Sequence, residues 1–206
     1  MKKLLFNIFL LLSVSAIAQW NANPIINTPI AIAPKGQDNS HVVTDSQGGA
    51  IIAWDDNRNS ATGQSDIFAQ RIRKNGVVKW TLNGTAICTH TATQKSSSIT
   101  ESDNGSAIIT WEDNRAGNYD IYAQKIDSSG NILWALNGIA VCSKTTQQKN
   151  PKILSDDLGG AIIVWEDSLN NYWDIYAQRI SSTGSLLWTS TGVVVCNSSN
   201  TQINPR

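Results

Sequence analysis

The chain lacks several common sequence signals of nucleic-acid binding, metal binding and catalysis. Sixteen basic residues balance sixteen acidic ones, and no segment collects charge of one sign, so the basic footprint that nucleic acids or anionic membranes require is absent. Only two histidines occur, His41 and His90, and neither has metal-ligand spacing to a partner. The sequence contains no G-x-S-x-G, no phosphate-binding glycine loop and no C-x-x-C. We therefore expect no nucleic-acid partner.

Long apolar runs are missing after the first eighteen residues. Within those eighteen, Lys2 and Lys3 precede the apolar run Leu4–Val14, and Ala16-Ile17-Ala18 is a small-x-small cleavage site. This layout predicts a secretory signal peptide, because the apolar run is too short to cross a bilayer. We expect an exported chain, secreted or at the cell surface, without a membrane span.

Cysteine is scarce, and its three copies are regularly placed. Cys88, Cys142 and Cys196 lie 54 residues apart, each at the end of a GIAVC-type segment. Equivalent positions of successive repeats are usually farther apart than the roughly 7 Å Cα limit of a disulfide. We expect each thiol to be a small buried hydrophobe, with cross-linking or metal binding as the alternative.

The chain does contain an internal repeat. The segment Gly105–Cys142 reads GSAIITWEDNRAGNYDIYAQKIDSSGNILWALNGIAVC, and close copies of it begin at Gly48 and Gly159. A fixed period of this size is typical of solenoids, propellers and arrays. We divide the chain into a signal peptide (1–18), a partial repeat (19–36), three full repeats (37–93, 94–147 and 148–201) and the start of a truncated fourth repeat (202–206). In the partial repeat, NTPIA matches GTAIC when Asn27 is aligned with Gly84.

Within a repeat the pattern predicts short strands and tight turns. In the second repeat we expect strands at 95–101, 107–111, 120–126 and 132–135, with the IAVC segment leading to the next unit. The run at 107–111 is continuously apolar, so both of its faces should be covered. Four antiparallel strands form one blade of a β-propeller. The expected fold is all-β, with tandem four-stranded antiparallel repeats that are β-propeller-like; an open linear β-repeat array is the alternative.

The repeat resembles one found in a family of exported bacterial surface proteins. The string G-[GS]-A-I-I-x-W-[DE]-D-x-[RL] … D-I-[FY]-A-Q-[RK]-I … G … W carries this resemblance, starting at Gly48, Gly105 and Gly159. It covers most of residues 37–206 and is similar to repeats of Bacteroidetes-type proteins. The resemblance implies a β-propeller-like fold and export, and it implies no activity, because the family has no settled biochemistry.

Carboxylates recur where the apolar strand ends and the next strand begins. They are Asp56, Asp113 and Asp167 in the first position and Asp66, Asp120 and Asp174 in the second. In a hairpin the two positions would lie together and could offer oxygen ligands to Ca²⁺. The competing interpretation, which we favour, is that Asp56 and Asp113 pair with Arg58 and Arg115 and accept hydrogen bonds from loop N–H groups. In the third repeat Leu169 replaces the arginine, so we expect no cofactor, with Ca²⁺ as the alternative.

The same carboxylates could be read as a glycosidase pair, whose members lie about 5–10 Å apart. A catalytic site is normally unique, whereas these residues occur in three copies, so we expect no catalytic residue among them.

Seven of the eight tryptophans fall into three groups. Those inside the apolar runs should be core, and those at 80, 134 and 188 should pack between repeats, with a sugar-stacking platform as the alternative. Trp173 is a large aromatic in a polar loop of one copy only. It is therefore the first residue to consider as a ligand contact.

The sequence as a whole predicts a secreted or cell-surface β-propeller-like module, a non-catalytic binding or scaffolding fragment of a longer protein. The alternative is a fragment of a secreted carbohydrate-active enzyme or a sugar-binding propeller. An unidentified protein or glycan is the expected ligand. Closed propellers need four to eight blades, so we also expect further blades of the same chain or self-association.

Overall fold

The structure is a computed structural model that describes residues 27–59, 63–169 and 172–206. The expected signal peptide at 1–18 and the beginning of the partial repeat lie outside the described residues. None of the helical segments within the described ranges is long and apolar enough to cross a membrane.

These residues form three four-stranded antiparallel sheets and one short 3-10 turn, η1 (Asp103–Gly105). The first sheet holds β1 (Gln37–Thr44), β2 (Ala50–Asp56), β3 (Asp66–Ile72) and β4 (Thr85–Cys88). The second holds β5 (Gln94–Glu101), β6 (Ala107–Asp113), β7 (Asp120–Ile126) and β8 (Ile139–Cys142). The third holds β9 (Gln148–Ser155), β10 (Ala161–Leu169), β11 (Tyr172–Ile180) and β12 (Val193–Cys196). The all-β expectation with four antiparallel strands per unit is confirmed.

The fourth strand of each sheet is not where the sequence pattern placed it. In the second sheet it is β8 (Ile139–Cys142), and the expected strand at 132–135 is wrong, because Ile132 makes only an isolated bridge with Ile126. Gly138, with a φ of 87°, turns the chain after that bridge. Strand β8 then pairs with the first half of β7. Both segments thus run beside β7, one at each of its ends.

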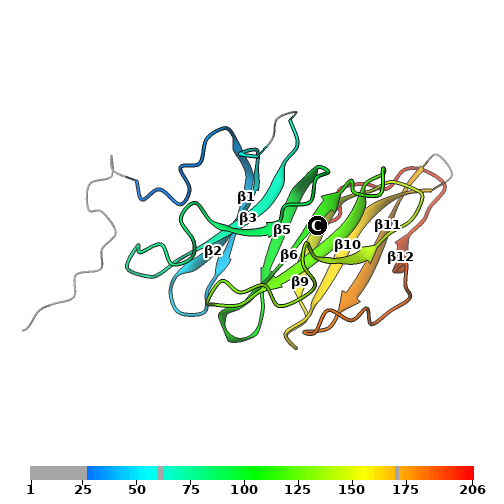
Figure 1. The fold of residues 1–206 in the computed structure, drawn as a ribbon. Coiled ribbons are helices and arrows are strands. Elements are labelled where there is room, and N and C mark those ends of the chain that lie inside the picture. The colour runs from blue at the N-terminus through cyan, green and yellow to red at the C-terminus, as the bar shows by residue number, and fades with distance from the viewer. Residues whose placement is uncertain (1–26, 60–62, 170–171) are drawn as a thin grey trace, which may run out of the picture.

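The three sheets lie face to face in chain order, and an apolar core fills each space between neighbours (Figure 1). Alternation along β6 assigns its side chains to the two cores: Ile109 faces the first sheet and Ile108 faces the third. Every residue of β6 is buried, as its continuous apolar run predicts. The equivalent of Ile108 in the third sheet, Ile162, is partly exposed, since no described sheet covers that face.

Both ends of the described chain follow the pattern of the repeats. The N–H of Ile32 donates to Asn83 Oδ1 at 2.9 Å, as Thr89 N–H donates to Asn137 Oδ1 in the next unit. At the other end, Gln202 N–H donates to Trp173 O. The segment 202–206 therefore lies against the third sheet as the start of a first strand lies against the other two.

A buried glutamine organises the outer part of each sheet. Gln124 is 0% exposed. Its Nε2 donates to Ala135 O at 2.7 Å, and its Oε1 accepts the N–H groups of Lys125 and Trp134, each at 3.0 Å. Gln70 and Gln178 make the same bonds in the other sheets. The side-chain amide of Gln124 thus bonds the backbone of Trp134 and Ala135 and holds these two residues beside β7, where they form no backbone strand pairing.

The tryptophans join neighbouring sheets. Trp80 donates its indole N–H to Ser128 O at 3.2 Å, and its ring lies so close to Gly130 that a Cβ there would be 2.8 Å from it. Trp134 makes the equivalent contacts with the third sheet. The expected packing between repeats is confirmed for these two, whereas Trp188 is 39% exposed. The core tryptophans, also as expected, are buried: Trp54, Trp111 and Trp165.

Cys88 and Cys142 are buried free thiols, as the sequence predicted. Burial raises the pKa of each to about 12. Cys196 is a free thiol that is only partly buried, because its sheet has no described neighbour on that side.

The glutamine bridges predict a stability effect. Replacing Gln124 with leucine would leave the N–H groups of Lys125 and Trp134 without their acceptor, so we expect the free energy of unfolding in urea to fall by about 2–4 kcal/mol. The same replacement at exposed Gln64 is the control and should change it by less than about 0.5 kcal/mol. Equal effects at the two positions would contradict the structural role of the bridge.

The thiols predict a reactivity pattern. In the native protein, a thiol reagent should modify Cys196 rapidly, and Cys88 and Cys142 only after unfolding, because the thiolate is the reactive form. Mass spectrometry of partly labelled protein measures this, and Cys196→Ser should remove the fast phase. Rapid labelling of Cys88 in folded protein would show that the first core is open.

Candidate functional site

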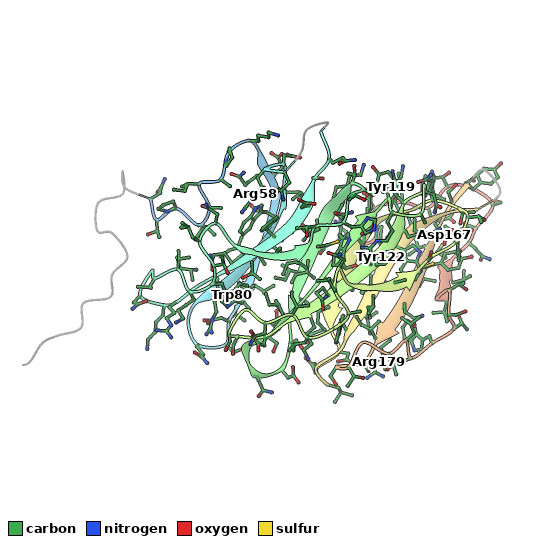
Figure 2. All side chains as sticks on the ribbon, viewed as in Figure 1. Arg58, Trp80, Tyr119, Tyr122, Asp167 and Arg179 are labelled. Carbon is green, nitrogen blue, oxygen red and sulfur yellow. The ribbon has the colours of Figure 1, made fainter. Side chains whose placement is uncertain are left out.

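The two sets of aspartates meet at one end of the sheets. Strand register places Asp113 of β6 opposite Asp120 of β7, and the equivalent pairs are Asp56 with Asp66 and Asp167 with Asp174. Figure 2 shows Arg58, Tyr119 and Asp167 toward this end, and Trp80 and Arg179 toward the other. The expected proximity of the two carboxylate positions is therefore confirmed.

Asp56 is enclosed by donors of its own repeat. The indole N–H of Trp54 donates to Oδ2 at 2.7 Å, while Arg58 donates its Nε to Oδ1 at 2.8 Å and its Nη2 to Oδ2 at 2.6 Å. The Arg58 backbone N–H also bonds Oδ1, and its guanidinium lies 3.9 Å from the ring centre of Phe68. Burial raises the pKa of the Asp56 carboxyl, but the bonds from Arg58 and Trp54 outweigh it and hold the pKa below its ordinary value.

The second repeat copies this arrangement. Asp113 accepts from the Trp111 indole at 2.9 Å and from Arg115 Nε at 2.8 Å, and Arg115 stacks on Tyr122 at 3.9 Å. The predicted pairing of Asp56 and Asp113 with the following arginines is thus confirmed.

The third repeat keeps the carboxylate and changes its cation. Lys144, from the connection before β9, donates to Asp167 Oδ2 at 2.7 Å, and Thr146 donates to Oδ1 at 3.1 Å. The Lys144 ammonium lies 4.1 Å from the ring centre of Tyr176, as the arginines lie over the rings of the other repeats. The Trp165 indole N–H has no partner here. A cation from the preceding connection thus compensates for Leu169.

The second aspartates have weaker surroundings. Asp66 accepts one bond from Asn59 Nδ2 at 2.9 Å. Asp120 accepts from Asn118, from the Ser143 hydroxyl and from the Lys144 N–H. Burial raises the pKa of both Asp66 and Asp120. No described residue forms a hydrogen bond with Asp174, which is 8% exposed.

These contacts bear on the Ca²⁺ alternative. The acceptor atoms of Asp56, Asp113 and Asp167 are directed at cationic groups, which a metal ion would have to displace. Within the described ranges, no group of three or more His, Cys, Asp or Glu side chains is placed to hold a metal ion.

The acidic residue just before each of these aspartates has a separate task, which the sequence analysis missed. Asp55 accepts the N–H groups of Ser96 and Ser97, in the first strand of the next sheet, at 2.7 and 3.1 Å. Glu112 accepts the N–H of Asn150 at 2.9 Å in the same way. Ser96 and Asn150 have positive φ, so the carboxylate satisfies a strand irregularity that would otherwise leave a buried donor. Adjacent residues on a strand point to opposite faces. The paired acidic residues in the sequence could therefore have indicated that the first of each pair has different partners from the second.

Trp173 lies at a position that carries an aromatic residue in two repeats. Its equivalent 54 residues earlier is Tyr119, so the expectation of an aromatic residue in one copy only is wrong. The expected polar loop is also wrong, because Trp173 lies in strand β11. Both rings are half-buried. Lys95 lies 4.4 Å from the ring centre of Tyr119, and Lys149 lies 5.6 Å from the ring centres of both Tyr119 and Trp173. Counting one period back from Trp173 would have found Tyr119.

One pocket opens beside Asp66. It has a volume of about 240 Å³ and is lined by Asn59, Gln64, Asp66, Thr89, His90 and Thr91. His90 has no equivalent in the other repeats, where Lys144 and Ser198 occupy its place. A histidine in the pocket lining is therefore specific to the first repeat.

Comparisons with known proteins found structural likeness only. No family model matches the chain, and no curated protein matches it. Among solved structures, a family 43 glycoside hydrolase from Bacillus licheniformis matches with a TM-score of 0.49 at 9% identity, over 80% of this chain and 46% of its own. An endo-arabinase from Bacteroides thetaiotaomicron matches with a TM-score of 0.44 at 14% identity, over 76% of this chain and 62% of its own. The chain thus spans about half the length of these enzymes.

The Asp56 environment predicts a pH-dependent stability defect. With Arg58 replaced by methionine, Asp56 is buried without its counter-charge, and we expect about 3 kcal/mol less stability near pH 7. In the wild type the lowered pKa of Asp56 adds stability that is present above the unfolded-state pKa and is lost as pH falls through the folded-state pKa. In the variant the sign reverses, because an unpaired buried carboxyl has a raised pKa and binds its proton first in the folded state.

The deficit of Arg58→Met relative to wild type should therefore shrink between about pH 7 and about pH 4.5 in urea unfolding. Arg73→Met, at an exposed arginine of the same repeat, is the control and should show little deficit at either pH. A deficit that stays constant with pH would mean that Arg58 acts through packing alone.

Proposed function

We propose that the chain is a secreted or cell-surface propeller-type repeat module that acts by binding or scaffolding. The observation that carries the non-catalytic part is the saturation of Asp56, Asp113 and Asp167. Each is bound by a cation that also stacks on an aromatic ring. A carboxylate held in this way is a packing element and is poorly placed to exchange protons with a substrate.

The propeller interpretation is supported by where neighbouring sheets touch. The most extensive contacts between sheets join β1 with β5 and β5 with β9, which are the first strands. Sheets that meet mainly along one edge form a fan, whereas a linear array would bring whole faces together evenly. A further sheet of this type, from additional repeats or a second molecule, would cover Val195, which is 60% exposed, whereas its equivalents Ile87 and Val141 are buried.

Export and a bacterial cell-surface setting are also part of the proposal. They are supported by the signal-peptide pattern at 1–18 and by the repeat's resemblance to exported surface proteins.

The second candidate is a carbohydrate-active fragment, and one specific observation favours it. Asp66 has a pKa raised by burial and lines a pocket with His90. A protonatable carboxyl and an imidazole in one repeat-specific pocket are groups that acid–base catalysis uses.

One assay separates the two candidates. The full chain is incubated with a panel of neutral and acidic polysaccharides, and the release of reducing ends is measured. We expect no release above that of the Asp66→Asn variant. Release that is abolished by Asp66→Asn and His90→Ala, and retained in the matched Asp120→Asn variant, would replace the binding proposal with the enzyme.

A further inference from the structure

We propose that Tyr119, Lys149 and Trp173 form a binding site for an acidic polysaccharide, with the uronic acid carboxylate on Lys149 and sugar ring faces on the two aromatic rings. This inference rests on the binding function proposed above and names its ligand class. No described contact within the fold requires this combination of side chains.

The first argument is the difference between repeats. The position of Trp173 holds Tyr119 in the second repeat and Ser65 in the first. The position of Lys149 holds Lys95 in the second repeat and Asp38 in the first. Because the first repeat folds into the same four-stranded sheet with serine and aspartate there, stacking of the sheets does not need the aromatic residue or the lysine.

The second argument is geometry. The Lys149 ammonium lies 5.6 Å from each ring centre, near the outer limit of a cation–π contact. It therefore lies near two rings of adjacent repeats without being tightly held by either. The two ring centres are at most twice that distance apart, so one ligand can contact both rings and the ammonium together.

The third argument is charge. Within the described chain, the ion pairs account for Lys95, Lys125 and Lys144, and none includes Lys149. Glu166, which faces Lys149 across the strands, accepts the Asn204 N–H on Oε1 and the Asn150 amide on Oε2. Glu112 accepts the Asn150 N–H and lies 3.8 Å from Lys95. Glu166 thus holds two other donors, and no described carboxylate forms an ion pair with the Lys149 ammonium, which can therefore bind an anion.

Together these features select the ligand class. Aromatic faces bind the apolar C–H face of a sugar ring, and an ammonium binds a carboxylate through a charge-assisted hydrogen bond. A neutral polysaccharide would use only the rings, and an acidic peptide only the ammonium. A chain of uronic acids uses both.

Affinity electrophoresis of the full chain in gels containing polygalacturonate tests this proposal. We expect retardation of the wild type, with apparent affinity weakened about tenfold in Lys149→Gln and about threefold to tenfold in Trp173→Ala. Trp173→Phe should restore most of the loss. The matched controls are Lys152→Gln, an exposed lysine on the same strand, and Trp188→Ala, an exposed tryptophan outside the site; both should bind as wild type does. Thermal unfolding shows that each variant is folded.

Three results would overturn the site. The first is no retardation of the wild type, and the second is an equal loss in Lys152→Gln, which would indicate unspecific charge. The third is equal retardation by a neutral galactan or by polyglutamate, which would reject the uronic acid class. Release of reducing ends from polygalacturonate is a separate readout, and it would count against the proposed non-catalytic function rather than against this site.

Discussion

Each sheet of this chain needs apolar cover on both faces, and the rest of the structure depends on that requirement. Ile108 and Ile109 are neighbours on β6, both fully buried, yet they belong to different cores. A four-stranded sheet of this kind is stable only when stacked between others. The indole of Trp80 and the carboxylate of Asp55 both reach across to the next sheet. Polar and aromatic groups thus fix the spacing of sheets that hydrophobic burial brings together.

Three aspartates, each two residues after a core tryptophan, show that this packing requires a counter-charge for their buried carboxylates. They are Asp56, Asp113 and Asp167. Asp113 is paired with Arg115 of its own hairpin, while Asp167 is paired with Lys144 from the preceding connection. A buried unpaired carboxylate is costly, so the loss of arginine at Leu169 is balanced by a cation from elsewhere. The partner changes while the carboxylate, the cation and the stacked ring remain. A buried carboxylate that keeps a cation and a stacked ring in every repeat has a structural role.

The sequence was sufficient for features that depend on neighbours within one hairpin. The period, the continuous apolar run, the carboxylate pairs and the Arg58 and Arg115 partners were all predicted from local spacing. The fourth strand was misplaced because Gln124, ten residues before Trp134, holds that segment through its side chain. Lys144 was missed because its contact with Asp167 joins a connection to the next sheet. Such contacts depend on how neighbouring sheets stack. The local sequence pattern does not specify that stacking.

Differences between repeats separate structural from functional substitutions. Leu169 departs from the arginine of the other repeats, and Lys144 restores what was lost, so that change belongs to packing. Trp173 departs from Ser65, yet the first repeat builds the same sheet without it. Its half-buried ring lies beside Lys149, whose charge no described ion pair uses. A substitution that places an aromatic ring beside an ammonium without an ion pair, and that the fold does not require, therefore supports the ligand site proposed above.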